Sequence, residues 1–123
     1  MARDRFINTS YNYRFEDTDG MTSLLYVMRM FRCGFRTLGG LEVMEVLDCR
    51  KHRIGYTKSE AVEYRLAGGS VVTIRPSVNK PELTADISVA GGDPETAAAI
   101  EARIREDLEG IIYMDSRMGY CCE

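Results

Sequence analysis

Residues 70–89 read SVVTIRPSVNKPELTADISV, and this stretch combines two β-strand patterns with a proline-bounded bend. Residues 70–74 are rich in β-branched side chains, and residues 83–89 alternate apolar and polar side chains with a period of two. Pro76 and Pro81 cannot donate to a sheet ladder, and they disfavour helix in the residues that precede them. The pattern therefore predicts two strands joined by a stiff, open loop.

The loop carries side chains that suit an anion. Arg75 offers a planar fork for phosphate or carboxylate, Ser77 and Asn79 offer neutral donors, and Lys80 adds a positive charge. The backbone amides from Ser77 through Val78 to Lys80 are expected to form an anion-binding nest. An ordinary solvated hairpin loop contains the same residue types, and residue types alone leave that alternative open.

Residues 67–83 resemble the phosphate loop of the phosphohexomutase C-terminal domain. In this family, the phosphoglucomutases and phosphomannomutases, the loop reads Arg-Pro-Ser-Gly-Thr-Glu-Pro-Lys. Four of these eight positions match here, and they are Arg75, Pro76, Ser77 and Pro81. The resemblance implies that the loop grips the phosphate of a phosphosugar. The phosphate-binding residues it implies are Arg75, Ser77, Val78, Asn79 and Lys80.

The resemblance also implies a place in carbohydrate metabolism. Phosphohexomutases are isomerases that move a phosphate between positions of a hexose, using a phosphoserine, a magnesium loop and a sugar loop on other domains. A clamp alone positions a substrate without transferring phosphate, so we expect the isolated chain to be inactive. The resemblance further implies that this chain holds no cofactor, that Mg²⁺ binds only in other domains, and that the other domains of a larger mutase are its protein partners. A second copy of the chain is the alternative protein partner.

A second hypothesis is a degenerate or engineered structural and interaction domain with no ligand. Val78 stands where the family has glycine, and a β-branched residue does not take the positive φ that glycine permits. Lys80 and Glu82 also reverse two charges of the family loop. Residues 7–13 correspond in position to the family's sugar loop, but the two carboxylates of that loop are missing here.

Two helices and two further strands are expected around the loop. Residues 21–32 and 94–112 place apolar side chains at intervals of three and four, and residues 41–48 and 61–67 alternate like strands. Asp93 is the expected N-cap of the second helix, and Pro94 is its expected first residue. The expected apolar stripes are Met21, Leu24, Leu25, Met28 and Phe31 in the first helix and Ala97, Ile100, Ile104, Leu108 and Ile111 in the second. The charged residues Glu101, Arg103, Arg105, Glu106 and Glu109 are expected on the solvated face of the second helix.

These elements predict an α+β fold. We expect a four-stranded, mainly antiparallel sheet with two helices packed on one face. The resemblance implies that this arrangement is TATA-binding-protein-like, as in phosphohexomutase C-terminal domains. The predicted boundaries are a poorly defined segment at 1–16, the phosphohexomutase C-terminal-like domain at 17–112, and a loose tail at 113–123.

Composition excludes several function classes. A chain of 123 residues supports one modest domain, and it has neither an apolar stretch of membrane-spanning length nor a visible signal peptide, so we expect a cytoplasmic protein without membrane contact. The chain has a formal net charge of −3 and does not show the clustered lysines and arginines on which nucleic-acid binding depends. Metal binding is not expected at Asp17 and Asp19, which suit helix capping, nor at the four cysteines and His52. We assign Cys121 and Cys122 no role and expect reduced thiols.

Overall fold

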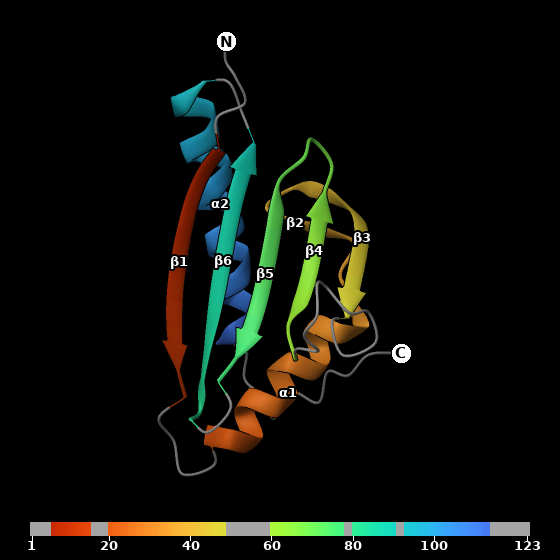
Figure 1. The fold of residues 1–123 in the computed structure, drawn as a ribbon, viewed down its shortest axis with the longest axis vertical. Helices are drawn as coiled ribbons and strands as arrows, with labels where there is room; N and C mark the ends of the chain where they lie inside the picture. Colours follow the sequence, from red (N-terminus) through yellow and green to blue (C-terminus); the bar gives the residue numbers. More distant parts are fainter. Residues whose placement is uncertain (1–5, 16–19, 49–59, 78–79, 91–92, 114–123) are drawn as a thin grey trace, which may run out of the picture.

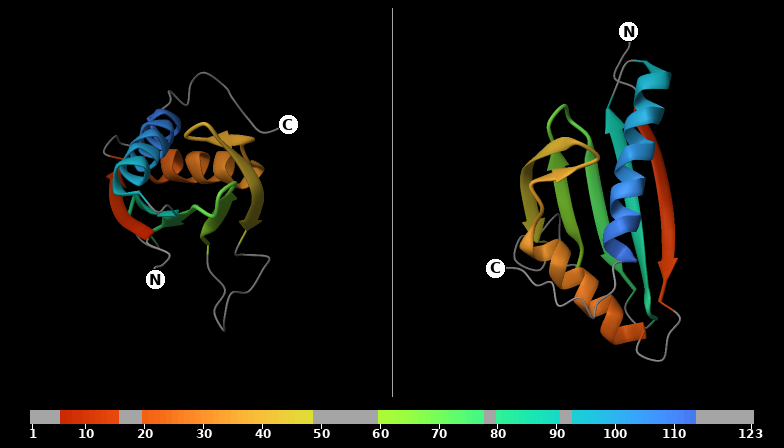
Figure 2. Two further views of the ribbon diagram at one scale, coloured as in Figure 1. Left: turned by 90° about the horizontal axis from the view of Figure 1, so that it is seen from above. Right: turned by 180° about the vertical axis from the view of Figure 1, so that it is seen from behind.

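The computed structural model describes residues 6–15, 20–48, 60–77, 80–90 and 93–113. Within these ranges, six antiparallel strands form one twisted sheet in the order β1-β6-β5-β4-β3-β2, and both helices cover the same face (Figures 1 and 2). The elements are β1 (Phe6–Arg14), α1 (Gly20–Cys33), β2 (Thr37–Leu38), β3 (Leu41–Asp48), β4 (Val62–Leu66), β5 (Val71–Pro76), β6 (Glu82–Ala90) and α2 (Pro94–Ile112). The predicted α+β class is confirmed, but the sheet has six strands and not four.

The extra long strand, β1, comes from the segment that was predicted to be poorly defined. It pairs with β6 without interruption, from Phe6 opposite Ala90 to Arg14 opposite Glu82. Its period of two is easily overlooked because the inward-facing positions include Thr9 and tyrosines as well as Ile7. The second extra strand, β2, has only two residues and pairs with the start of β3.

α2 begins as predicted, because Asp93 caps it and Pro94 occupies its first turn. The Asp93 carboxylate accepts a hydrogen bond from the Thr96 amide at 3.1 Å, which satisfies a backbone donor that the helix itself leaves open. One prediction was wrong: Glu101 does not lie on the solvated face but is 8% exposed, packed toward β1. Hydroxyl donors on β1 explain why this carboxylate is tolerated there.

α1 packs one face on the sheet, and Leu24, Met28 and Phe31 are buried as predicted. Leu25 is 63% exposed and does not belong to the apolar stripe, whereas Val27 is buried. Those two positions lie on opposite sides of the helix face that meets the sheet, so helical spacing alone does not choose between them.

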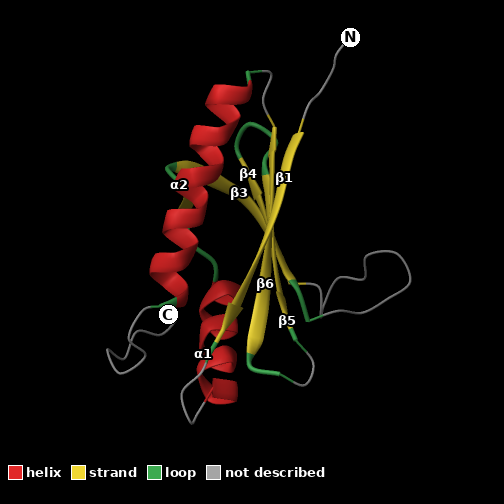
Figure 3. Ribbon diagram, turned by 90° about the vertical axis from the view of Figure 1, so that its left-hand side faces the viewer, coloured by secondary structure: helices red, strands yellow, loops and turns green. Residues whose placement is uncertain are grey.

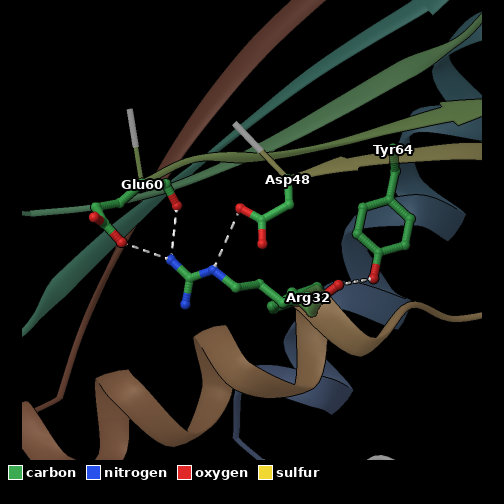
Figure 4. A network of polar contacts seen from close by, with 5 residues as sticks. Arg32, Asp48, Glu60 and Tyr64 are labelled. Carbon is green, nitrogen blue, oxygen red and sulfur yellow. Dashed lines mark hydrogen bonds and ion pairs between the residues drawn. The ribbon is translucent and has the colours of Figure 1, made fainter. Parts of the chain in front are cut away.

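The end of α1 is tied to two strands (Figure 4). The Arg32 guanidinium lies 3.8 Å from the Asp48 carboxylate at the end of β3 and donates to the backbone oxygen of Glu60 at 2.9 Å. The Tyr64 hydroxyl on β4 donates to the Phe31 carbonyl oxygen. Charge and hydrogen bonding therefore fix the helix over β3 and β4, in addition to apolar packing.

A register shift changes which residues of β3 face the helices. The shift lies between Val43 and Glu45, opposite β4, and beyond it Val46 packs against the core. Strict alternation predicts Leu47 on the same face as Val43, and the shift moves that role to Val46, as a β-bulge does.

Candidate anion-binding site

The bend between β5 and β6 is closed by backbone hydrogen bonds. The Ser77 amide donates to the Glu82 carbonyl at 2.8 Å, and the Glu82 amide donates to the Lys80 carbonyl at 2.8 Å. The Pro81 carbonyl accepts from the Phe15 amide at 2.8 Å, which joins the bend to the end of β1. The predicted strand–bend–strand arrangement is present. The Ser77 amide was predicted to form part of an anion-binding nest, but it is hydrogen-bonded to Glu82 and is not available to an anion.

Arg75 lies near the end of β5, on the sheet face that the helices leave uncovered. Its side chain is 53% exposed, and its Nε donates to Oδ2 of Asp86 on β6 at 2.8 Å. Its terminal nitrogens have no partner among the residues that the structure describes. The fork that suits a phosphate is therefore open, while one donor of the guanidinium is used.

The contact with Asp86 turns Arg75 away from the bend. The residue directly opposite Arg75 is Thr84, whereas Asp86 stands opposite Thr73, two residues farther from the bend. Two residues of an antiparallel strand span roughly 7 Å. In this conformation the guanidinium reaches toward the middle of the sheet, and Lys80 remains on the bend itself.

Ser10 of β1 belongs to the same polar cluster. Its hydroxyl donates to Oδ1 of Asp86, so Ser10, Asp86 and Arg75 form a chain of contacts across β1, β6 and β5. The position that the resemblance gives to a sugar-selecting loop is thus an edge strand here. Its contribution to the uncovered face is a hydroxyl and two amides, from Asn8 and Asn12.

The charges around the bend leave a small positive excess. Arg14, Arg75 and Lys80 are basic, and Glu82 and Asp86 are acidic. Arg14 forms an ion pair with Glu82 at 2.8 Å, and that hydrogen bond, followed by the nearby charges, lowers the pKa of the Glu82 carboxyl. The carboxylates of Glu82 and Asp86 each form an ion pair with an arginine. Lys80 has no ion-pair partner among the described residues.

Of the five predicted phosphate-binding residues, the structure describes Arg75, Ser77 and Lys80, and Val78 and Asn79 lie outside the described residues. Sequence reasoning missed Asp86 and Ser10. The alternation in residues 83–89 put Asp86 on one face with Thr84, but its contact with Arg75 depends on the register between two strands. The Ser10 contact depends on the pairing of β1 with β6, which local sequence does not encode.

Several other predictions fall outside the described residues, namely those on Asp17 and Asp19, on His52 and on Cys121 and Cys122. Among the described residues, no group of three or more metal-ligating side chains comes together, and no helix has the length and hydropathy to cross a membrane. Cys33 is disulfide-bonded, a state that the sequence did not predict. The expected absence of a cofactor stays a prediction.

No protein-family model matches the chain, and no curated protein matches it.

Proposed function

We propose that this chain is the phosphate-binding C-terminal domain of a phosphohexomutase-like protein, acting in carbohydrate metabolism in the cytoplasm and inactive as an isomerase by itself. In this proposal the fold is the TATA-binding-protein-like arrangement of that family, extended at both sheet edges by β1 and β2. The proposed ligand is the phosphate of a hexose phosphate, and Mg²⁺ and the phosphoserine belong to other domains of the parent protein.

The observation that supports the proposal best is the site of Arg75. Arg75 stands near the end of β5 with its guanidinium fork open, and the bend that follows presents the exposed Lys80. A planar fork and a point charge are the two cation types that proteins use for phosphate, and charge-assisted hydrogen bonds are the stronger class. A phosphate bound there would be held and oriented, which is the part of the family's reaction that this loop supplies.

Binding requires Arg75 to move. The Asp86 carboxylate has to release Nε, or the guanidinium has to pivot around that contact, before the fork can face the bend. An exposed ion pair is worth about 0.2–1 kcal/mol, so a phosphate dianion can displace it at modest cost. We therefore expect weak binding from the isolated domain and tighter binding when other domains supply further contacts.

Titration of the isotope-labelled chain with glucose-1-phosphate, inorganic phosphate and glucose tests the proposal by nuclear magnetic resonance. Both phosphates are expected to shift resonances of Arg75, Ser77 and Lys80 at millimolar ligand, and glucose is not. Arg75→Gln removes the charged fork and is expected to weaken binding about tenfold or more. Arg65→Gln is the matched control, because Arg65 is also exposed on β4 and paired with Glu63.

The result that would contradict the proposal is silence of these resonances toward both phosphates, or an equal loss of binding in Arg75→Gln and Arg65→Gln. The second outcome would indicate non-specific attraction to a basic surface.

A second candidate is an interaction domain with no ligand. The observations that favour it are two hydrogen bonds, from the Ser77 amide to Glu82 and from Nε of Arg75 to Asp86, because each uses a donor that the predicted phosphate clamp would need. This candidate is selected if the chain ignores both phosphates and its mass rises with concentration in light scattering.

A further inference from the structure

The two edges of the sheet differ in how they are protected. At one edge, β2 has only two residues and ends at the tight turn of Gly39 and Gly40. At the other edge, β1 has nine residues and forms a continuous ladder with β6. Figure 3 looks onto this second edge, where β1 lies at the margin of the sheet with α2 on one face. A long edge strand presents about half of its amides and carbonyls outward, unpaired by the sheet.

β1 also lacks the usual features that prevent edge pairing. Its sequence, FINTSYNYR, contains no proline, glycine or lysine, and none of these nine described residues has a positive φ. Its register with β6 contains no bulge. The single charge is Arg14 at the very end, where it pairs with Glu82. Natural edge strands are commonly blunted by such breaks or charges, and β1 is not.

Helix α2 holds β1 in an extended conformation. Glu101 accepts hydrogen bonds from Thr9 at 3.0 Å and from the Tyr11 hydroxyl at 2.6 Å, and Glu109 accepts one from the Tyr13 hydroxyl at 2.8 Å. Because these bonds fix the strand before any partner arrives, little ordering entropy is lost when the outer edge pairs. The strand is therefore a preformed template.

We propose that the partner of this edge is β1 of a second copy of the chain, paired antiparallel about a two-fold axis at Ser10. This is the register in which all nine residues pair, and it keeps the helices of both copies on one face of a continuous sheet. It places Asn8 opposite the Asn12 of the other copy and Thr9 opposite its Tyr11. The two Arg14 side chains lie at opposite ends of the paired strands, whereas parallel pairing would bring them together.

Two charge variants on the uncovered face test this register. In Asn8→Lys/Asn12→Lys, each new lysine faces a lysine of the other copy, so we expect the chain to remain monomeric. In Asn8→Lys/Asn12→Asp, each lysine faces an aspartate, so we expect the dimer to be retained. Residues 8 and 12 of one strand are roughly 14 Å apart, so neither pair acts strongly within a monomer.

The measurement is the mass of the full chain in light scattering and sedimentation, from low micromolar to millimolar concentration. The unmodified chain is expected to double its mass with concentration, and circular dichroism of the dilute variants checks that each is folded. A chain that stays monomeric throughout, or a Lys/Lys variant that dimerises like the parent, overturns the proposal. Loss of the dimer in both variants overturns the two-fold register. None of these mass measurements depends on phosphate binding, so the dimer can fail while the proposed phosphate site stands, and the reverse.

Discussion

At the scale of single residues, the contact between Arg75 and Asp86 decides how the candidate site works. Asp86 can either orient the guanidinium for a ligand or compete with that ligand for it. The geometry favours competition, because Asp86 stands two residues beyond Thr84, the residue opposite Arg75, on the side away from the bend. Ser10 fixes Asp86 from the neighbouring strand, so the competing carboxylate is itself held in place.

Asp86→Asn is therefore expected to tighten phosphate binding. The substitution keeps the shape of the side chain but removes the charge that holds Nε of Arg75, and an exposed pair worth about 1 kcal/mol at most corresponds to a gain of up to about fivefold. Calorimetric or resonance titration with inorganic phosphate measures it. Glu63→Gln is the matched control, since it neutralises a carboxylate that pairs with Arg65 on the same sheet face. Weaker binding by Asp86→Asn would instead make Asp86 an orienting residue for Arg75.

At the scale of elements, the turn between β2 and β3 is pressed against α2. Gly39 has a φ of 60°, and its amide donates to the Asp107 carboxylate of α2 at 2.7 Å. A Cβ at Gly39 would meet the backbone nitrogen of Ile104 at 2.8 Å. By contrast, Gly68 in the turn between β4 and β5 has a φ of 92°, and a Cβ added there would meet no described atom within 4 Å. Both turns require a positive φ, but only Gly39 lies so close to the α2 backbone that an added Cβ would clash with it.

This contrast makes a prediction about stability. Gly68→Ala is expected to lower the free energy of unfolding by about 1–2 kcal/mol, the cost of a left-handed conformation for a residue with a Cβ. Gly39→Ala adds the contact with the α2 backbone and is expected to cost a further 1–3 kcal/mol, roughly. Urea unfolding of both variants measures the difference. Equal losses would show that α2 is not packed against this turn.

The elements that sequence predicted correctly are those whose signals are local. The bend at Pro76 and Pro81, the strand pairs around it and the Asp93 cap of α2 each depend on neighbours in sequence, and all are present. Glu101 was assigned to solvent because helical spacing shows its charge but not the hydroxyls of β1 that receive it. For the same reason the candidate site was predicted without Ser10, whose partner is 76 residues away.

At the scale of the whole molecule, two buried tyrosines connect the two helices to the sheet. Tyr13 of β1 donates to Glu109 of α2, and Tyr64 of β4 donates to the carbonyl of Phe31 in α1. Burial raises the pKa of both phenols well above the ordinary value, and for Tyr13 the hydrogen bond and charge of Glu109 raise it further. Each helix is thus held by a phenol that must remain protonated.

Folding should consequently weaken in alkali. The unfolded chain ionises its tyrosines at about pH 10, whereas the folded state keeps these two tyrosines neutral at that pH. Their contribution to the free energy of unfolding is therefore complete below that pH. It is lost as the pH rises toward the higher pKa of the folded state. Each tyrosine is expected to remove about 1.4 kcal/mol of unfolding free energy per pH unit in that range. Tyr13→Phe is less stable than the parent at neutral pH because Glu109 loses its donor, but its stability should fall less steeply in alkali. Urea unfolding at successive pH values gives both slopes, and parallel curves for parent and variant would show that Tyr13 ionises as readily in the folded chain as in the unfolded one.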